Sequence, residues 1–126
     1  MKFNHYYKEL GLKDTDFLFE NYEDIADRNK EDAEGFCDCE FFSLDYSLAL
    51  YIYGRLRYFE DHCLYGYPAN MTEQEWKNIL KKIIKAFKLY IKKDDDELSL
   101  QMTKNKQKQI NYGMRLFIKY FSHLWY

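Results

Sequence analysis

Residues 72–93 constrain the fold of this chain more than any other segment. Thr72 and Glu75 match a capping box, in which two side chains satisfy the free backbone donors at a helix start. At about 100° per residue, one side of the segment carries large apolar residues and the other carries lysines. The apolar residues are Trp76, Ile79, Leu80, Ile83, Ile84, Phe87, Tyr90 and Ile91. The pattern predicts a surface helix that packs one face against an apolar partner.

Two other segments are predicted to be helical. Residues 108–126 place their apolar side chains in one arc. The polar stretch before them, residues 97–109, is either a loop or the exposed start of this helix, and we favour a start at about Leu98. Residues 44–62 are apolar around most of the helix circumference, which is typical of a buried helix. Gly54, within that helix, is expected to mark a kink or a close helix crossing. We therefore predict that residues 44–62 form the centre of the fold and that a charge at Ile52 would be strongly destabilising.

Length and composition bound the fold class. A chain of 126 residues fits one domain and is too short for two independent cores. It contains no valine, and other β-branched residues are sparse, so a large sheet is not expected. We predict a single all-α, mainly helical domain over residues 1–126, a small helical bundle around a buried central helix. Residues 43–126 form its helical core, and a less regular acidic segment, 1–42, packs on it with a helix at 16–25 and a loop at 27–40.

The cysteine count and the N-terminal residues indicate a cellular location. Three cysteines are an odd number and cannot form a complete disulfide framework, which favours free thiols in a reducing compartment. The first residues do not match a secretion signal, and no segment approaches roughly 18 uncharged apolar residues. We expect a cytoplasmic protein with no membrane partner.

Cys37, Cys39, His62 and Cys63 offer four ligands, the number that a structural zinc ion takes. Paired zinc-binding cysteines usually have two to four residues between them, and the single residue here makes chelation of one ion awkward, so we expect ordinary thiols and no metal. The scattered glycines form no phosphate-binding loop, and the histidines form no Ser/His/Asp arrangement. The sequence therefore predicts no cofactor, no catalytic residues and no enzyme activity.

Charge is strongly separated along the chain. Residues 1–50 carry 13 Asp and Glu against 5 Lys and Arg, whereas residues 51–126 carry 8 against 14. Such a chain can offer an acidic surface to a basic partner and a basic surface to an acidic one. Two copies can also associate through the two surfaces, so a homodimer is a further expected partner.

Two sets of residues are candidate binding sites. The acidic set has spaced carboxylates that imitate nucleic-acid phosphates for a basic groove, although such runs are most often solvated surfaces. Its members are Glu23, Asp24, Asp27, Glu31, Asp32, Glu34 and Asp38. The basic set is either the solvated side of a surface helix or a contact surface for nucleic acid or an anionic membrane. Its members are Lys77, Lys81, Lys85, Lys88 and Lys92.

Arg55 lies within the apolar arc of the helix predicted at residues 44–62. Two interpretations are open. The side chain either extends to the rim of the apolar surface or forms a buried ion pair, most simply with Asp45.

Motifs in the second part of the chain carry a resemblance. They are the stretches 42–49, 55–56, 66–68, 71–76, 83–87 and 116–125, which read FSLDYSLA, RL, GYP, MTEQEW, IIKAF and LFIKYFSHLW. In order and spacing they resemble a family of uncharacterised phage and prophage proteins, over about residues 35–126. Phe42 stands where that family usually has Trp, and Gly54 stands where it usually has Pro. The resemblance implies a phage or mobile-element origin and a compact helical fold, and it implies no particular activity.

The leading hypothesis is a non-enzymatic phage protein that inhibits a host defence protein, as an anti-CRISPR inhibitor or a similar anti-defence protein. The acidic set would bind the basic nucleic-acid groove of such an effector in the host cytoplasm. The alternative is a phage accessory protein that binds nucleic acid through the basic set. The sequence pI of about 5.9 argues against this alternative.

Overall fold

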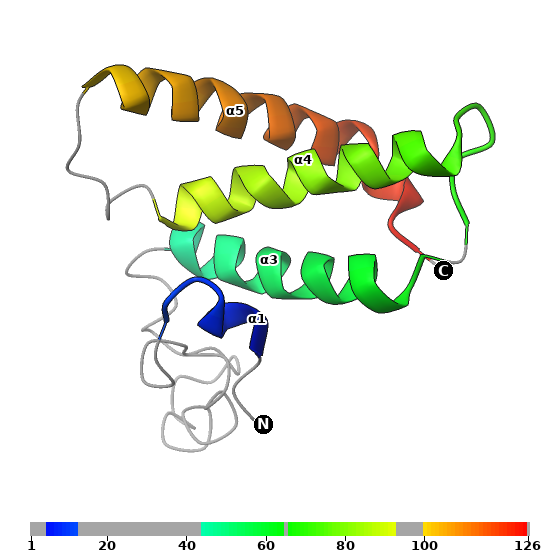
Figure 1. The fold of residues 1–126 in the computed structure, drawn as a ribbon, viewed down its shortest axis with the longest axis horizontal. Helices are drawn as coiled ribbons and strands as arrows, with labels where there is room; N and C mark the ends of the chain where they lie inside the picture. Colours follow the sequence, from blue (N-terminus) through cyan, green and yellow to red (C-terminus); the bar gives the residue numbers. More distant parts are fainter. Residues whose placement is uncertain (1–4, 13–43, 65, 93–99, 126) are drawn as a thin grey trace, which may run out of the picture.

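The computed structural model describes residues 5–12, 44–64, 66–92 and 100–125. Within these ranges the chain is helical and has no strand, which confirms the all-α prediction. The elements are α1 (His5–Lys8), α3 (Leu44–His62), α4 (Glu73–Ile91), α5 (Leu100–Lys119) and the 3-10 turn η5 (Phe121–His123) (Figure 1). The helix predicted at 16–25 and the loop at 27–40 lie outside the described residues.

The helix in the middle of the bundle is α4. It packs along α3 on one side and along α5 on the other (Figure 1). It also buries the most side chains, namely Trp76, Leu80, Ile83, Ile84, Ala86, Phe87 and Ile91. The prediction that residues 44–62 form the buried centre is therefore not confirmed. That helix, α3, lies at one side of the bundle and leaves Leu44, Leu48, Tyr51 and Tyr58 exposed.

The start of α4 follows from its capping box. The backbone N–H of Glu75 donates to Thr72 Oγ1 at 3.1 Å, and the backbone N–H of Thr72 donates to Glu75 Oε1 at 3.4 Å. Each side chain thus satisfies a backbone donor that no helical carbonyl reaches. The last long helix, α5, begins at Leu100, so its polar first half is helical and the start at about Leu98 is close to the observed one. Lysine and glutamine, which are abundant there, are good helix formers.

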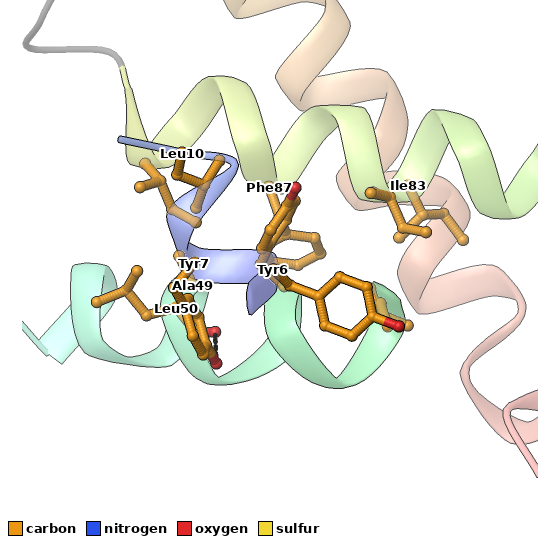
Figure 2. Close-up of a cluster of buried hydrophobic side chains, with 11 residues drawn as sticks. Tyr6, Tyr7, Leu10, Ala49, Leu50, Ile83 and Phe87 are labelled. Atoms are coloured by element: carbon orange, nitrogen blue, oxygen red, sulfur yellow. Dashed lines mark hydrogen bonds between the residues drawn. The ribbon is translucent and has the colours of Figure 1, made fainter. Parts of the chain in front are cut away.

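The short helix α1 docks onto α3 through aromatic side chains. Tyr6, Tyr7 and Leu10 are buried in the core cluster, and Figure 2 shows α1 lying across α3 and α4 with Tyr7 reaching the backbone of α3. The Tyr7 hydroxyl donates to the carbonyl oxygen of Leu50 at 2.8 Å. The Tyr7 ring lies where a side chain on Gly54 would be, since a Cβ there would lie 2.5 Å from Tyr7 Cζ. The close approach expected at Gly54 is therefore made by α1.

Replacing Gly54 with Ala should loosen the docking of α1. Ala favours the helix by about 1 kcal/mol over Gly, but the added methyl group overlaps a buried ring, and such overpacking costs typically about 1–3 kcal/mol. We expect a net loss of stability and faster proteolysis before α3, measured by urea unfolding and limited digestion. Gly66→Ala is the matched control, because a Cβ at Gly66 meets nothing within 4 Å. Equal stability of the two variants would contradict this packing.

α4 and α5 touch at a pair of small residues. A Cβ placed on Gly113 would overlap the Ala86 side chain and lie 2.8 Å from the carbonyl oxygen of Lys82. Gly113 therefore permits the two helix backbones to approach closely at this point. Near the other end of the contact, Trp76 is buried and meets Tyr120 edge to face at a centroid distance of 5.7 Å. None of the described helices has the length and apolar character needed to cross a membrane.

Candidate nucleic-acid interface

A line of lysines runs along the exposed side of α4. Spacings of three and four residues place all of them within one narrow arc of the helix. Lys81, Lys85 and Lys88 are exposed, while Lys77 and Lys92 are half-buried. We call Lys77, Lys81, Lys85, Lys88 and Lys92 the lysine ridge. It is the basic set predicted from the sequence, and the structure brings it together on one surface.

Among the described residues, most of the lysine ridge has no acidic partner. Lys77 pairs with Glu73, with Nζ 3.3 Å from Oε1. Within the described part of the chain, the other four lysines form no ion pair. All the described residues together carry 14 Lys and Arg against 6 Asp and Glu, a net charge of +8. A row of unpaired cations on a positively charged unit produces a local field that attracts anions.

A shallow cavity lies beside the ridge. Its volume is about 470 Å³, and Lys81, Lys85 and Lys88 of α4 line one side. The other side is formed by Glu9, which follows α1, and by Tyr53, Arg57 and Glu60 of α3. The cavity therefore has cations along one side and a mixed charged network along the other.

Arg57 is the centre of that network. Its guanidinium contacts Glu9 Oε1 at 3.0 Å, Glu60 Oε1 at 3.0 Å and Asp61 Oδ1 at 3.5 Å. The hydrogen bonds to Glu9 raise the pKa of Arg57 further above its usual value, against the opposing effect of burial. Because three carboxylates surround it, Arg57 is neutralised locally and ties the residues after α1 to α3. Of the cavity's cations, Lys81, Lys85 and Lys88 have no ion pair with any described residue, whereas Arg57 does.

Glu60 has one carboxylate oxygen in an unusual position. Its Oε1 accepts from Arg57, but its Oε2 is buried and has no hydrogen-bond partner among the described residues. A buried acceptor without a donor is costly, and it gains free energy when a donor reaches it. Glu60 lines the cavity, but this oxygen is itself buried and is not part of the surface that a ligand there would meet.

No family model, curated protein or solved structure matches the chain. The resemblance to phage and prophage proteins therefore stays a prediction, and the site is interpreted from its own geometry.

The other predicted site residues fall into two groups. The acidic set, Glu23, Asp24, Asp27, Glu31, Asp32, Glu34 and Asp38, lies outside the described residues, as do Cys37 and Cys39. Cys63 is a buried free thiol, and the exposed His62 ring packs on Tyr58 at a centroid distance of 4.5 Å. Across the described ranges no group of His, Cys, Asp or Glu could hold a metal ion.

Arg55 does not form the buried ion pair with Asp45. It is exposed, and its guanidinium lies 3.4 Å from the centroid of the Tyr51 ring on the same helix. Asp45 accepts a hydrogen bond from the Tyr90 hydroxyl of α4 instead. Arg55 therefore extends along the rim, as in the first of the two interpretations. The charged hub that sequence reasoning missed is Arg57, and its signal was the pair of carboxylates three and four residues later, Glu60 and Asp61.

Alkaline pH should weaken the docking of α1. Burial, followed by the hydrogen bond that Tyr6 donates to Asp61 at 2.7 Å, raises the pKa of Tyr6 from 10.0 to about 12. The folded state therefore holds this proton more tightly than the unfolded state does. The stability that the protonated Tyr6 hydroxyl contributes is complete below pH 10 and is lost as the pH rises to about 12.

The measurement is the free energy of unfolding of wild type and Tyr6→Phe as a function of pH. At pH 8 the variant should be less stable by about 1 kcal/mol, the usual worth of one hydrogen bond. The difference should fall steadily as the pH rises from 10 to about 12. All other titratable groups are common to the two proteins and cancel in the comparison. A difference that stays constant over this range would show that Tyr6 is not the titrating group.

Proposed function

We propose that this protein is a phage or mobile-element accessory protein without enzyme activity, and that it binds nucleic acid through the lysine ridge. The supporting observation is the row of four unpaired lysines on one surface of a described unit whose net charge is +8. Lysines three or four residues apart along a helix can each contact a phosphate. Each such contact releases counterions from the nucleic acid. The negative charge of the whole chain comes from residues outside the described unit.

The cavity beside the ridge adds a place for a nucleobase. Its volume of about 470 Å³ is sufficient for one base, and Lys81, Lys85 and Lys88 stand where phosphates would flank it. Single-stranded nucleic acid, whose bases are not paired, suits this arrangement better than a regular duplex.

The test is an electrophoretic shift assay at low salt with random-sequence single-stranded RNA and DNA. Wild type should bind both, with an affinity that falls steeply as salt rises. The variant K81Q/K85Q/K88Q should bind at least about tenfold more weakly. The slope of log affinity against log salt should decrease by roughly 0.7 for each phosphate that the variant no longer neutralises.

The matched control is K104Q/K108Q/K119Q, which removes the same charge from exposed lysines of α5. It should bind within about threefold of wild type, because exposed charges farther away are screened by salt. Absence of a shift with wild type, or equal weakening in the two triple variants, would overturn this proposal.

The second candidate function is inhibition of a host defence protein, such as a CRISPR effector, by the acidic set in the host cytoplasm. It is favoured by the 13 Asp and Glu among residues 1–50 and by the phage resemblance. The test is a pull-down from host lysate with wild type and with Asp24, Asp27, Glu31 and Asp32 replaced by Lys. Recovery of the same partners by both proteins would exclude binding through the acidic set. The shift assay separates the two candidates, because a phosphate mimic does not bind nucleic acid.

A further inference from the structure

The outer side of α3 carries a regular stripe of exposed side chains. They are Leu44, Leu48, Tyr51, Arg55, Tyr58 and His62, at successive spacings of 4, 3, 4, 3 and 4 residues. Four of them are large hydrophobic residues that are 44–53% exposed. The residues that α3 buries, including Ala49, Leu50, Tyr53 and Leu56, lie on the opposite side of the helix. We call the six exposed residues the α3 stripe.

The spacing of the α3 stripe is that of a coiled-coil seam. Alternating steps of three and four residues keep a row of side chains facing one partner helix over its whole length. The stripe runs along all of α3, from its first residue to its last. A continuous exposed row of this kind marks a protein contact, whereas isolated exposed hydrophobic residues need no explanation. The lysine ridge is on a different helix, so the two surfaces are separate.

We propose that the α3 stripe binds the same stripe of a second copy of this chain, with the two helices antiparallel. The charge of Arg55 decides the orientation. In a parallel pair, Arg55 of one copy would face Arg55 of the other, and two like charges would be brought together. In an antiparallel pair centred between Tyr51 and Arg55, each Arg55, which already lies over the Tyr51 ring of its own chain, also faces the ring of the partner's Tyr51, and a second cation–π contact keeps the like charges apart.

The rest of the stripe is complementary in the same register. Leu48 faces the partner's Tyr58, and Leu44 faces the partner's His62. The positions that flank the seam bring no like charges together, because Asp45 lies opposite the partner's Phe59 and Asp61 lies opposite the partner's Ser47. A two-fold interface of this type is closed, so association stops at the dimer.

Sedimentation equilibrium of the full chain tests the proposal. At tens of micromolar, wild type should have twice the 15.5 kDa mass of the chain. The variants L48K and Y58E should each weaken dimerisation at least about 100-fold, because the symmetry removes two apolar contacts at once. Y112E is the matched control, since Tyr112 is exposed to the same degree on α5. It should remain a dimer, and circular dichroism should show that all three variants are folded.

An equimolar mixture of L48K and Y58E tests the orientation. In the antiparallel dimer, Lys at position 48 of one variant faces Glu at position 58 of the other, and the second Leu48–Tyr58 contact is intact. The mixture should therefore dimerise although each variant alone does not. A monomeric wild type, or dimers of both variants alone, would overturn the use of the α3 stripe. A mixture that stays monomeric would overturn the antiparallel arrangement.

Discussion

Replacing Ile83 with Asp is expected to unfold the protein. Ile83 has no exposed surface and lies in the middle of α4, the helix that contacts both of its long neighbours. A carboxylate there would be buried without a partner, at a cost of several kcal/mol, which is of the order of the whole stability of a small domain, about 5–15 kcal/mol. Circular dichroism and a thermal melt at neutral pH should show loss of helix and no cooperative transition.

Two control variants sharpen this prediction. Lys85, two residues further along α4, is exposed, and Lys85→Asp should cost well under about 1 kcal/mol. Ile52 of α3 is only half-buried, so Ile52→Asp should be less damaging than Ile83→Asp. From the sequence alone, a charge at Ile52 was predicted to be strongly destabilising. A folded Ile83→Asp protein, or an Ile52→Asp protein that is the less stable of the two, would mean that α4 is not the central helix.

Replacing Gly113 with Leu should destabilise the protein by about 3 kcal/mol or more, since overpacking at a rigid contact reaches this range. The new side chain would have to fit where the first carbon atom already overlaps Ala86 and approaches the Lys82 carbonyl oxygen. α4 and α5 must therefore separate, and the apolar surface between them becomes less well packed. Urea unfolding at constant temperature gives the change in free energy.

Asn111→Leu provides the control for Gly113→Leu. It places the same side chain on the exposed side of α5, where it should change the stability by less than about 0.5 kcal/mol. A second test uses Gly113→Ala with and without Ala86→Gly. Removing the Ala86 methyl group should recover part of the stability, because it removes the closest of the overlapping atoms. Additive effects of the two substitutions would contradict a direct contact.

The sequence was informative where residues within one helix are sufficient to predict that helix. The capping box and the one-sided apolar pattern predicted α4, and the lysines opposite that pattern predicted the ridge. α3 was predicted at its observed bounds, but periodicity could not show which of its apolar sides faces the core. Both sides of α3 are apolar, and only the packing of α1 and α4 distinguishes them. The position of the central helix therefore required the tertiary structure.

The parts that the sequence did not predict depend on contacts between distant residues. α1 has four residues, too few to show a helical period, and its structure depends on the burial of Tyr6 and Tyr7 against α3. The Arg57 network is local in its contacts to Glu60 and Asp61, and only the contact to Glu9 depends on another element. The cavity of the candidate site exists only because these residues meet.

The docking of α1 also determines the order in which the chain can fold. Tyr7 bonds to a residue 43 positions later, and Tyr6 bonds to one 55 positions later. During synthesis the N-terminal residues leave the ribosome before α3 and α4 exist, so α1 has no surface to dock on at that time. The three long helices, whose contacts connect neighbours in the chain, can assemble first, and α1 joins last. In hydrogen exchange on the finished protein, the amides of α1 should then be the first to lose protection, before any of the long helices opens.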